Sequence, residues 1–242
     1  MAKPILVANW KNHPNSLSEA QKLLKEMSKK RELYKKVALF IAPPQPYLES
    51  TLLRTRNFAK LASQNFFSPE ILKSFGVRLA IIGHSDYRAL GESSEIVSQK
   101  IKLALRASIV PLVCIGESVR DVDGEHFEFL REELKSSLSG LKPLEAGKIA
   151  IAYEPIWTIG KRAKDALSAP ELAESVIFIK KVLTQLFNRA VAEKIPILYG
   201  GSVEPANAGE LMVGTGVRGF LVGHASLSAK SFETIAKSLL GK

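Results

Sequence analysis

Glu154 stands among residues whose types suit proton transfer. It lies in the segment 152–160, Ala-Tyr-Glu-Pro-Ile-Trp-Thr-Ile-Gly, at the end of an apolar run and ahead of a rigid Pro-Ile-Trp hinge. A carboxylate acts as a general base when it is partly desolvated and reaches a substrate carbon. Residues 155–161 form a candidate lid that would close over the site and exclude water from a reactive intermediate.

Other polar residues follow apolar runs elsewhere in the chain. Lys11 supplies a fixed positive charge for an anionic substrate and a developing oxyanion, and Asn9 and His84 can hydrogen-bond a substrate oxygen. Backbone N–H groups in the Gly-Gly-Ser segment 200–202, and around Gly223, make an anion nest of phosphate size. Together these groups favour proton abstraction next to a carbonyl of a small phosphorylated sugar.

Each of these residues also has a structural interpretation when taken alone. A single His84 is more often a hydrogen-bonded structural histidine, a single Lys11 is usually solvated, and Gly200 with Gly201 is a turn. Glu117 is expected to be structural, as a cap of the turn or helix that follows it. The combination of these residues at matched run ends is what indicates a function.

The apolar runs themselves predict the scaffold. They occupy residues 5–9, 37–42, 59–64, 79–83, 110–115, 149–154, 195–199 and 217–222. Most are continuously apolar, which is typical of parallel strands covered on both faces. Eight strands alternating with helices predict a closed (β/α)8 barrel of the TIM class, with its site at the carboxyl ends of the strands. An open doubly wound sheet is the alternative, but no G-x-G-x-x-G pattern follows the first run.

Helix start signals separate the runs. Three serines are expected to cap helices, the first and last with a glutamate three residues later: Ser16, Ser93 and Ser168. Pro170 falls in the first turn of the third helix, where proline is well tolerated. No low-complexity stretch or linker interrupts the alternation, so residues 1–242 are expected to form a single domain.

Composition limits the classes of function. With 46% hydrophobic residues the chain can bury a sizeable core, and its only cysteine, Cys114, forms no internal disulfide, as suits a reducing cytoplasm. Cys114 ends an apolar run and is expected to be a buried small hydrophobe. The N-terminus does not resemble a signal peptide, and no apolar run approaches the roughly 20 residues of a membrane span. The net charge of +10 comes with scattered lysines, without interleaved aromatics, so we expect no nucleic-acid partner.

Seven segments resemble triosephosphate isomerase, in that family's order and over nearly the whole chain. They are residues 8–11 (Ala-Asn-Trp-Lys), 62–65 (Ala-Ser-Gln-Asn), 82–85 (Ile-Gly-His-Ser), 114–117 (Cys-Ile-Gly-Glu), 152–157 (Ala-Tyr-Glu-Pro-Ile-Trp), 199–202 (Tyr-Gly-Gly-Ser) and 219–223 (Gly-Phe-Leu-Val-Gly). The resemblance implies interconversion of dihydroxyacetone phosphate and glyceraldehyde 3-phosphate, in glycolysis and gluconeogenesis, without cofactor or metal.

The resemblance also implies roles for individual residues. Glu154 would be the base and His84 the electrophile, with Lys11 and Asn9 as electrostatic partners. The substrate phosphate would lie against Gly160, Ser202 and Gly223, and we add Gly201 and His224 as candidate phosphate contacts.

One departure from the family concerns oligomeric state. The family usually carries a long loop after the third strand, which docks into a partner subunit beside the lysine and histidine. Here only residues 66–69, Phe-Phe-Ser-Pro, separate Asn65 from the next helix. The usual dimer is therefore in doubt, and we expect a monomer or a rearranged homo-oligomer. Phe66 and Phe67 are candidates for a new apolar contact or for local packing. Without a partner loop, the loops of the lysine and histidine should be more mobile.

Three further departures lie around the site. Asp86 stands where the family has a glutamate, so its contact with Lys11 is expected to lengthen or to pass through water. The far side of the lid is longer and more basic, and Lys161 or Arg162 could attract phosphate or form a solvated edge. His224 replaces a glycine and could crowd the phosphate nest or point away from it.

Three hypotheses follow from the sequence. The leading one is a working isomerase whose rate is below the family norm. The alternative, motivated by the short loop and His224, is a catalytically impaired isomerase-like barrel that serves as a phosphate-ligand binding or interaction protein. A basic nucleic-acid binder is the third.

Overall fold

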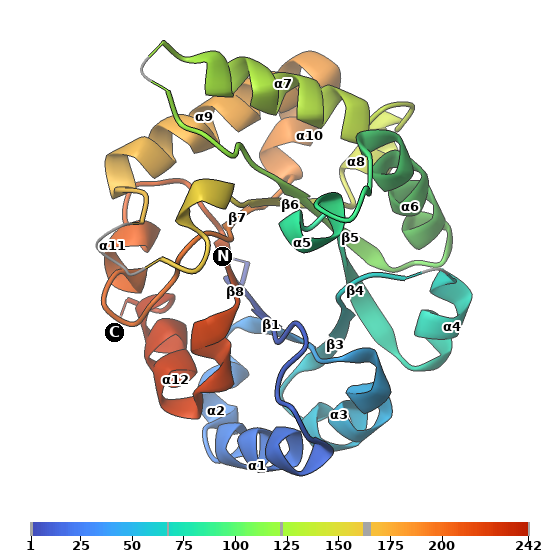
Figure 1. The fold of residues 1–242 in the computed structure, drawn as a ribbon, viewed down its shortest axis with the longest axis vertical. Coiled ribbons are helices and arrows are strands. Elements are labelled where there is room, and N and C mark those ends of the chain that lie inside the picture. The colour runs from blue at the N-terminus through green and yellow to red at the C-terminus, as the bar shows by residue number, and fades with distance from the viewer. Residues whose placement is uncertain (1, 67, 122, 162–165, 242) are drawn as a thin grey trace.

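Parallel strands close into a barrel at the centre of the molecule, and helices surround it (Figure 1). The computed structural model describes residues 2–66, 68–121, 123–161 and 166–241. Within those ranges eight strands pair in chain order, with β8 returning to β1. They are β1 Ile5–Asn9, β2 Ala38–Ala42, β3 Lys60–Ser63, β4 Val77–Ile82, β5 Val110–Ile115, β6 Ala150–Tyr153, β7 Ile197–Tyr199 and β8 Gly219–Val222. The expected (β/α)8 barrel of the TIM class is confirmed.

A glycine allows the barrel to close. Gly219 begins β8 with φ at 148° and pairs with Ile5 of β1. A Cβ built on Gly219 would lie 1.7 Å from the carbonyl oxygen of Ile5, so a larger residue would force the two strands apart.

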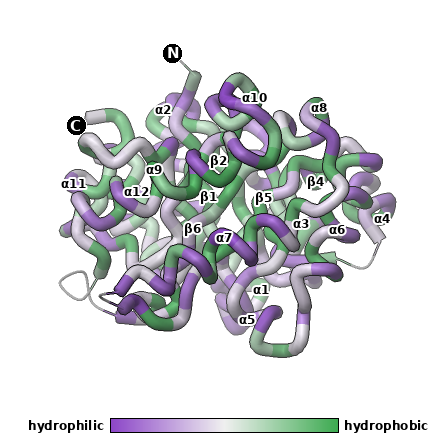
Figure 2. The backbone as a smooth tube through the Cα atoms, turned by 90° about the horizontal axis from the view of Figure 1, so that it is seen from above, coloured by the Kyte–Doolittle hydropathy of each residue, from purple (hydrophilic) through white to green (hydrophobic). Residues whose placement is uncertain are grey.

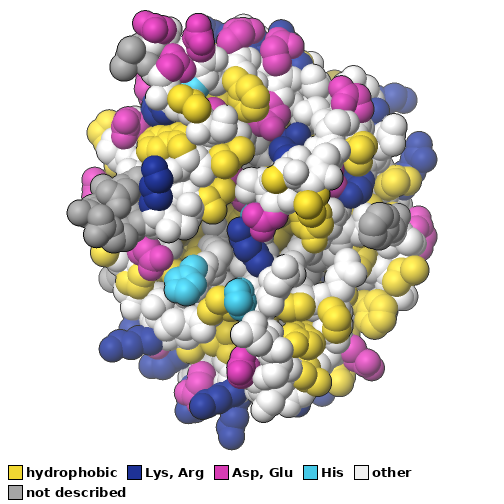
Figure 3. Space-filling model, viewed as in Figure 1, with side chains coloured by type: hydrophobic (Ala, Val, Ile, Leu, Met, Phe, Trp, Pro, Cys, Tyr) yellow, Lys and Arg dark blue, Asp and Glu magenta, His cyan; other side chains and the backbone are white. Residues whose placement is uncertain are grey.

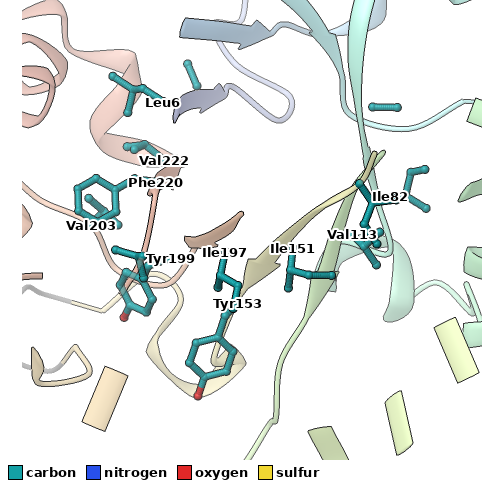
Figure 4. Close-up of a cluster of buried hydrophobic side chains, with 14 of the residues drawn as sticks. Leu6, Ile82, Val113, Ile151, Tyr153, Ile197, Tyr199, Val203, Phe220 and Val222 are labelled. Carbon is teal, nitrogen blue, oxygen red and sulfur yellow. The ribbon is translucent and has the colours of Figure 1, made fainter. Parts of the chain in front are cut away.

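Both faces of the strands are buried, which explains the continuous apolar runs. One cluster takes one or two residues from every strand, as only the barrel interior allows: Val7, Ala42, Ala62, Leu79, Ile81, Leu112, Cys114, Ala150, Ala152, Leu198 and Leu221. Alternate residues, such as Phe220 and Ile151, belong to a larger cluster that packs against the helices (Figure 4). The strands are accordingly mostly hydrophobic, whereas hydrophilic stretches concentrate in the outer helices (Figure 2).

The helices connect the strands and cover the barrel. The α-helices are α1 Leu17–Ser28, α2 Arg31–Tyr34, α3 Leu48–Thr55, α4 Pro69–Ser74, α5 Ser85–Arg88, α6 Ser94–Arg106, α7 Glu125–Ser137, α8 Pro143–Ala146, α9 Ala169–Leu186, α10 Arg189–Lys194, α11 Ala208–Met212 and α12 Ala229–Ser238. Short 3-10 turns are η1 Gln45–Tyr47, η2 Ile156–Thr158 and η4 His224–Leu227. No helix among the described residues is long and apolar enough to cross a membrane.

The expected helix caps are confirmed. The hydroxyls of Ser16, Ser93 and Ser168 accept hydrogen bonds from backbone N–H groups three residues on, in α1, α6 and α9. At α9 the two residues form a complete capping box, because the Glu171 carboxylate accepts a hydrogen bond from the Ser168 backbone N–H at 2.9 Å.

Three strand starts lie two residues from their predicted positions, and one of them is β8, which begins at Gly219 and not at Val217. β4 begins at Val77, two residues earlier than expected, because exposed Arg78 interrupts the apolar pattern that locates the strand. β7 begins at Ile197 and not at Ile195, whose backbone N–H still caps α10 by donating to Val191.

Candidate active site

A cavity of about 470 Å³ lies at the carboxyl ends of the strands. Nine of the predicted site residues line it: Asn9, Lys11, His84, Glu154, Gly160, Gly201, Ser202, Gly223 and His224. Seen into the barrel, the hollow holds a lysine or arginine side chain beside a carboxylate, with histidines at its edge (Figure 3). The remaining predicted residue, Asp86, lies beside Lys11 rather than in the lining.

Glu154 and His84 face each other inside the cavity. Glu154 Oε1 lies 3.5 Å from His84 Nε2, and both side chains are almost fully buried. The backbone N–H of Asp86 donates to His84 Nδ1 at 3.1 Å, so Nδ1 carries no proton. A neutral imidazole in this position therefore carries its proton on Nε2, directed toward the cavity. The pair presents a carboxylate acceptor and an N–H donor to one point.

Close backbone approaches set the position of Glu154. A Cβ on Gly200 would lie 2.7 Å from Glu154 Cγ, and one on Gly116 would lie 1.9 Å from its carbonyl oxygen. The Glu154 backbone N–H also donates to Ile115 at 2.7 Å. Glycine at both positions lets β5 and β7 press against the carboxylate-bearing residue from two sides.

Contacts within the chain hold Lys11. Its backbone N–H donates to Asn9 Oδ1 at 3.1 Å, and its carbonyl accepts from Gln64 Nε2 at 2.5 Å. Lys11 adopts φ of 50°, in the left-handed region that side-chain-bearing residues seldom occupy, so these contacts fix an unusual backbone.

The expected gap between Lys11 and Asp86 is wrong. Lys11 Nζ lies 3.0 Å from Asp86 Oδ2 and 3.2 Å from Oδ1, which is a direct ion pair. The shorter aspartate lies in the first turn of α5, two residues after the N-cap residue His84, and reaches the ammonium from there. The pair is partly exposed, so it directs the ammonium more than it stabilises the fold.

The loops after β6, β7 and β8 bring glycines and Ser202 to the cavity lining. Ser202 Oγ donates to the carbonyl of Lys161 at 2.6 Å, which links the loop after β7 to the candidate lid. Gly223 has open space where a Cβ would point, and Gly160 has φ of 75°. His224 is exposed and belongs to the cavity lining.

Glu117 is buried, but it does not cap the turn after it, which corrects that expectation. Its Oε1 accepts from the Tyr153 hydroxyl at 2.9 Å and from Trp157 Nε1 at 3.1 Å. Glu117 thus anchors the start of the candidate lid to β5. Burial, and then the Glu117 charge, raise the pKa of the Tyr153 hydroxyl well above its ordinary value.

Cys114 is a buried residue of the barrel interior, as expected. Burial raises the pKa of its thiol well above the ordinary value, and the neighbouring Glu154 charge acts in the same direction. The thiol is therefore inert. No group of three or more His, Cys, Asp or Glu side chains that could hold a metal occurs in the described ranges.

Sequence reasoning missed two charged residues behind the site. Arg88 pairs with Glu133 at 3.2 Å, and both side chains are mostly buried. Helical periodicity marks Glu133 only as a polar position on α7, and the sequence holds no signal that joins it to Arg88 or to the backbone around Glu154.

Comparison with known proteins agrees with this geometry. Residues 4–239 match the family model of triosephosphate isomerase. The chain belongs to the triosephosphate isomerase family. The triosephosphate isomerase of Citrifermentans bemidjiense is 36% identical over 253 residues, covering 98% of this chain and 99% of that protein. The triosephosphate isomerase of Dehalococcoides mccartyi strain BAV1 is 38% identical, and the match covers 98% of this chain and 96% of that protein. The triosephosphate isomerase of Geobacter metallireducens is 37% identical, and the match covers 97% of this chain and 98% of that protein.

The loop between β3 and α4 is short, and Phe66 within it packs into the chain's own core. Its side chain is 3% exposed within the large cluster between strands and helices. Phe67 lies outside the described residues, as does Arg162 of the lid. Lys161 lies with its Nζ 5.7 Å from the centre of the Trp157 ring.

Proposed function

We propose that the chain interconverts dihydroxyacetone phosphate and glyceraldehyde 3-phosphate, with Glu154 moving the proton through an enediolate intermediate. The family is one of aldose–ketose isomerases, so the chain is an enzyme of this class. The single observation that carries the assignment of residues is the 3.5 Å approach of Glu154 Oε1 and His84 Nε2 in one buried cavity.

The proposed reaction uses these two groups on adjacent substrate atoms. Glu154 takes a proton from the carbon next to the carbonyl, while the Nε2–H of His84 donates to the carbonyl oxygen. Return of the proton to the neighbouring carbon, together with transfer of the hydroxyl proton from the oxygen of the first carbon to the former carbonyl oxygen, yields the isomer. The net change is internal to the substrate, so no electron acceptor is required. This division of roles is the one already known for the family.

Lys11 and Asn9 support the charge that develops. The ammonium of Lys11, directed by Asp86, lies on the same cavity wall as His84 and would offset the negative charge of the enediolate and phosphate. Asn9 is 4% exposed and holds the Lys11 backbone through its Oδ1, which leaves its amide nitrogen to donate to the substrate oxygen.

We place the substrate phosphate on the opposite wall. Gly160, Gly201 and Gly223 carry no side chain there, which would leave their backbone N–H groups accessible to a phosphate. Its proposed contacts are Gly160, Gly201, Ser202, Gly223 and His224, all of which line the cavity. His224 is assigned to this wall as a donor through its backbone and, when protonated, as an added charge.

We further propose that residues 1–242 form one domain and that the enzyme acts in the cytoplasm. The continuous pairing from β1 to β8 and the match over residues 4–239 support the first proposal. The glycolytic role of the family and the unpaired, buried Cys114 support the second.

Replacing Glu154 with glutamine tests the base. Glu154→Gln keeps the shape of the side chain but removes its proton acceptor, so kcat should fall by about 10² to 10⁴-fold with the fold intact. A coupled assay with glyceraldehyde 3-phosphate measures the rate, and circular dichroism reports the fold. Glu174→Gln, an exposed carboxylate outside the cavity, is the matched control and should retain full activity. Full activity in Glu154→Gln would refute the assignment.

A further inference from the structure

A buried ion pair lies directly behind the proposed base and electrophile. Arg88 ends α5, Glu133 lies on α7, and Arg88 Nε approaches Glu133 Oε1 to 3.2 Å. Their side chains are 16% and 7% exposed, and neither lines the large cavity. Withdrawing both charges from water is costly, and an apolar pair would fill the space more cheaply. The contacts of the pair with the backbone near Glu154 and His84 indicate what it contributes to the site.

Glu133 fixes the backbone against which Glu154 lies. Its Oε2 accepts the backbone N–H of Gly116 at 2.8 Å. Gly116 in turn presses against the carbonyl of Glu154, as the 1.9 Å approach of a Cβ on Gly116 shows. Burial raises the pKa of the Glu133 carboxyl, and the Arg88 charge opposes that rise. The guanidinium favours the ionised form of the carboxylate that accepts the Gly116 N–H.

Arg88 reaches the other reacting residue from the same place. Its Nε donates to the carbonyl of Gly83 at 2.8 Å, one residue before His84. Its Nη2 lies 3.3 Å from the carbonyl of Cys114, at the end of β5. One planar guanidinium thus ties the end of β4, which carries His84, to the end of β5, which supports Glu154.

We propose that Arg88 and Glu133 are positioning residues that set the separation between His84 Nε2 and Glu154 Oε1. The proposal rests on the isomerase function proposed above and assigns neither residue a contact with substrate. Because a misplacement near 1 Å in a reacting group costs on the order of a hundredfold in rate, a small shift of either strand end is sufficient to slow the chemical step.

Arg88→Lys is the first test. Lysine keeps the charge but lacks the planar fork that holds three partners at fixed angles. We expect kcat to fall by about tenfold or more while KM changes by less than about twofold, because the phosphate wall is untouched. Arg131→Lys is the matched control. Arg131 lies on α7, as Glu133 does, and pairs with Glu128 at 3.0 Å, away from the cavity. Its replacement should therefore leave kcat and KM unchanged.

Glu133→Gln supplies a second variant if Arg88→Lys fails to fold. Glutamine retains an oxygen that accepts from the Gly116 N–H, so kcat should fall less than in Glu133→Ala. A purely structural role would lower stability in both variants without this graded effect on kcat. Thermal unfolding, measured on the same preparations, separates loss of fold from loss of rate.

A double-mutant cycle with Glu154→Asp distinguishes positioning from general support. The shortened carboxylate is already displaced, so Arg88→Lys should cost less in that background than in the wild type. The positioning proposal alone is overturned if the two substitutions of the cycle lower kcat by independent factors that multiply. It is also overturned if Arg88→Lys and Glu133→Gln are both fully active while the wild type is active. A wild type without turnover would instead remove the isomerase function on which it rests.

Discussion

Glu154 reaches its place opposite His84 because Gly116 and Gly200 leave room for it. A side chain on either glycine would fall within 2.7 Å of Glu154 atoms. The sequence predicted the base, the electrophile and the phosphate glycines from residue types at strand ends. It did not predict the packing role of Gly116 and Gly200, because that role depends on how closely neighbouring strands approach.

Gly200→Ala tests this packing at the residue scale. Gly200 has no left-handed φ, so alanine adds only the clash at 2.7 Å from Glu154 Cγ. Displacement of the carboxylate should lower kcat by on the order of a hundredfold, with a smaller change in KM. Gly209→Ala, in α11 with its nearest contact at 4.0 Å, is the matched control and should leave kcat unchanged. Steady-state kinetics of the two variants measures the difference, and equal activity would contradict the packing argument.

The ion pair of Lys11 and Asp86 shows why some residue-scale details escape the sequence. A shorter side chain suggested a longer contact, yet the measured separation is 3.0 Å. The backbone makes up the difference, since Lys11 adopts a left-handed φ and Asp86 lies in the first turn of α5. Neither feature can be derived from the lengths of two side chains.

At the scale of elements, capping residues located the helices well, and interrupted apolar patterns misplaced strand ends. Ser16, Ser93 and Ser168 begin helices where the sequence placed caps. Exposed Arg78 hid the start of β4, because a charged residue within a strand breaks the apolar run used to find it.

Ser168→Ala tests the cap of α9, the helix that follows the candidate lid. Loss of the hydroxyl should lower the free energy of unfolding by about 1 kcal/mol, a shift in Tm of about 2–4 °C for a chain of this size. Thermal unfolding followed by circular dichroism measures the shift. The exposed Ser74→Ala, near the end of α4, is the control and should change Tm by less.

The same cap predicts a pH dependence. Hydrogen bonds from Ser168 lower the pKa of the Glu171 carboxyl, so its contribution to stability is present above its unfolded pKa and is lost as pH falls through the folded pKa. The Tm difference between wild type and Ser168→Ala should therefore shrink in acid. A Tm difference that stays constant from neutral to strongly acidic pH would contradict a stabilising capping box at Ser168 and Glu171.

At the scale of the whole molecule, the described contacts of the reacting residues lie within one chain. Gln64, Asn9 and Asp86 hold Lys11, and Phe66, beside the shortened loop, is packed inside. The greater mobility expected for the lysine and histidine loops stays a prediction, as does a catalytic rate below the family norm.

We therefore expect each chain to work without the family's usual dimer. Specific activity should stay constant as the enzyme is diluted from micromolar to nanomolar concentration, because contacts within the chain hold Lys11 beside the cavity. Sedimentation velocity over the same range reports the oligomeric state. If the chain associates, exposed apolar side chains such as Ile71 and Phe75 of the α4 region offer a contact, at 60% and 39% exposure, and Ile71→Lys should then shift sedimentation without changing kcat. Activity that falls on dilution in step with dissociation would mean that a partner completes the site after all, and would reject the self-sufficient chain.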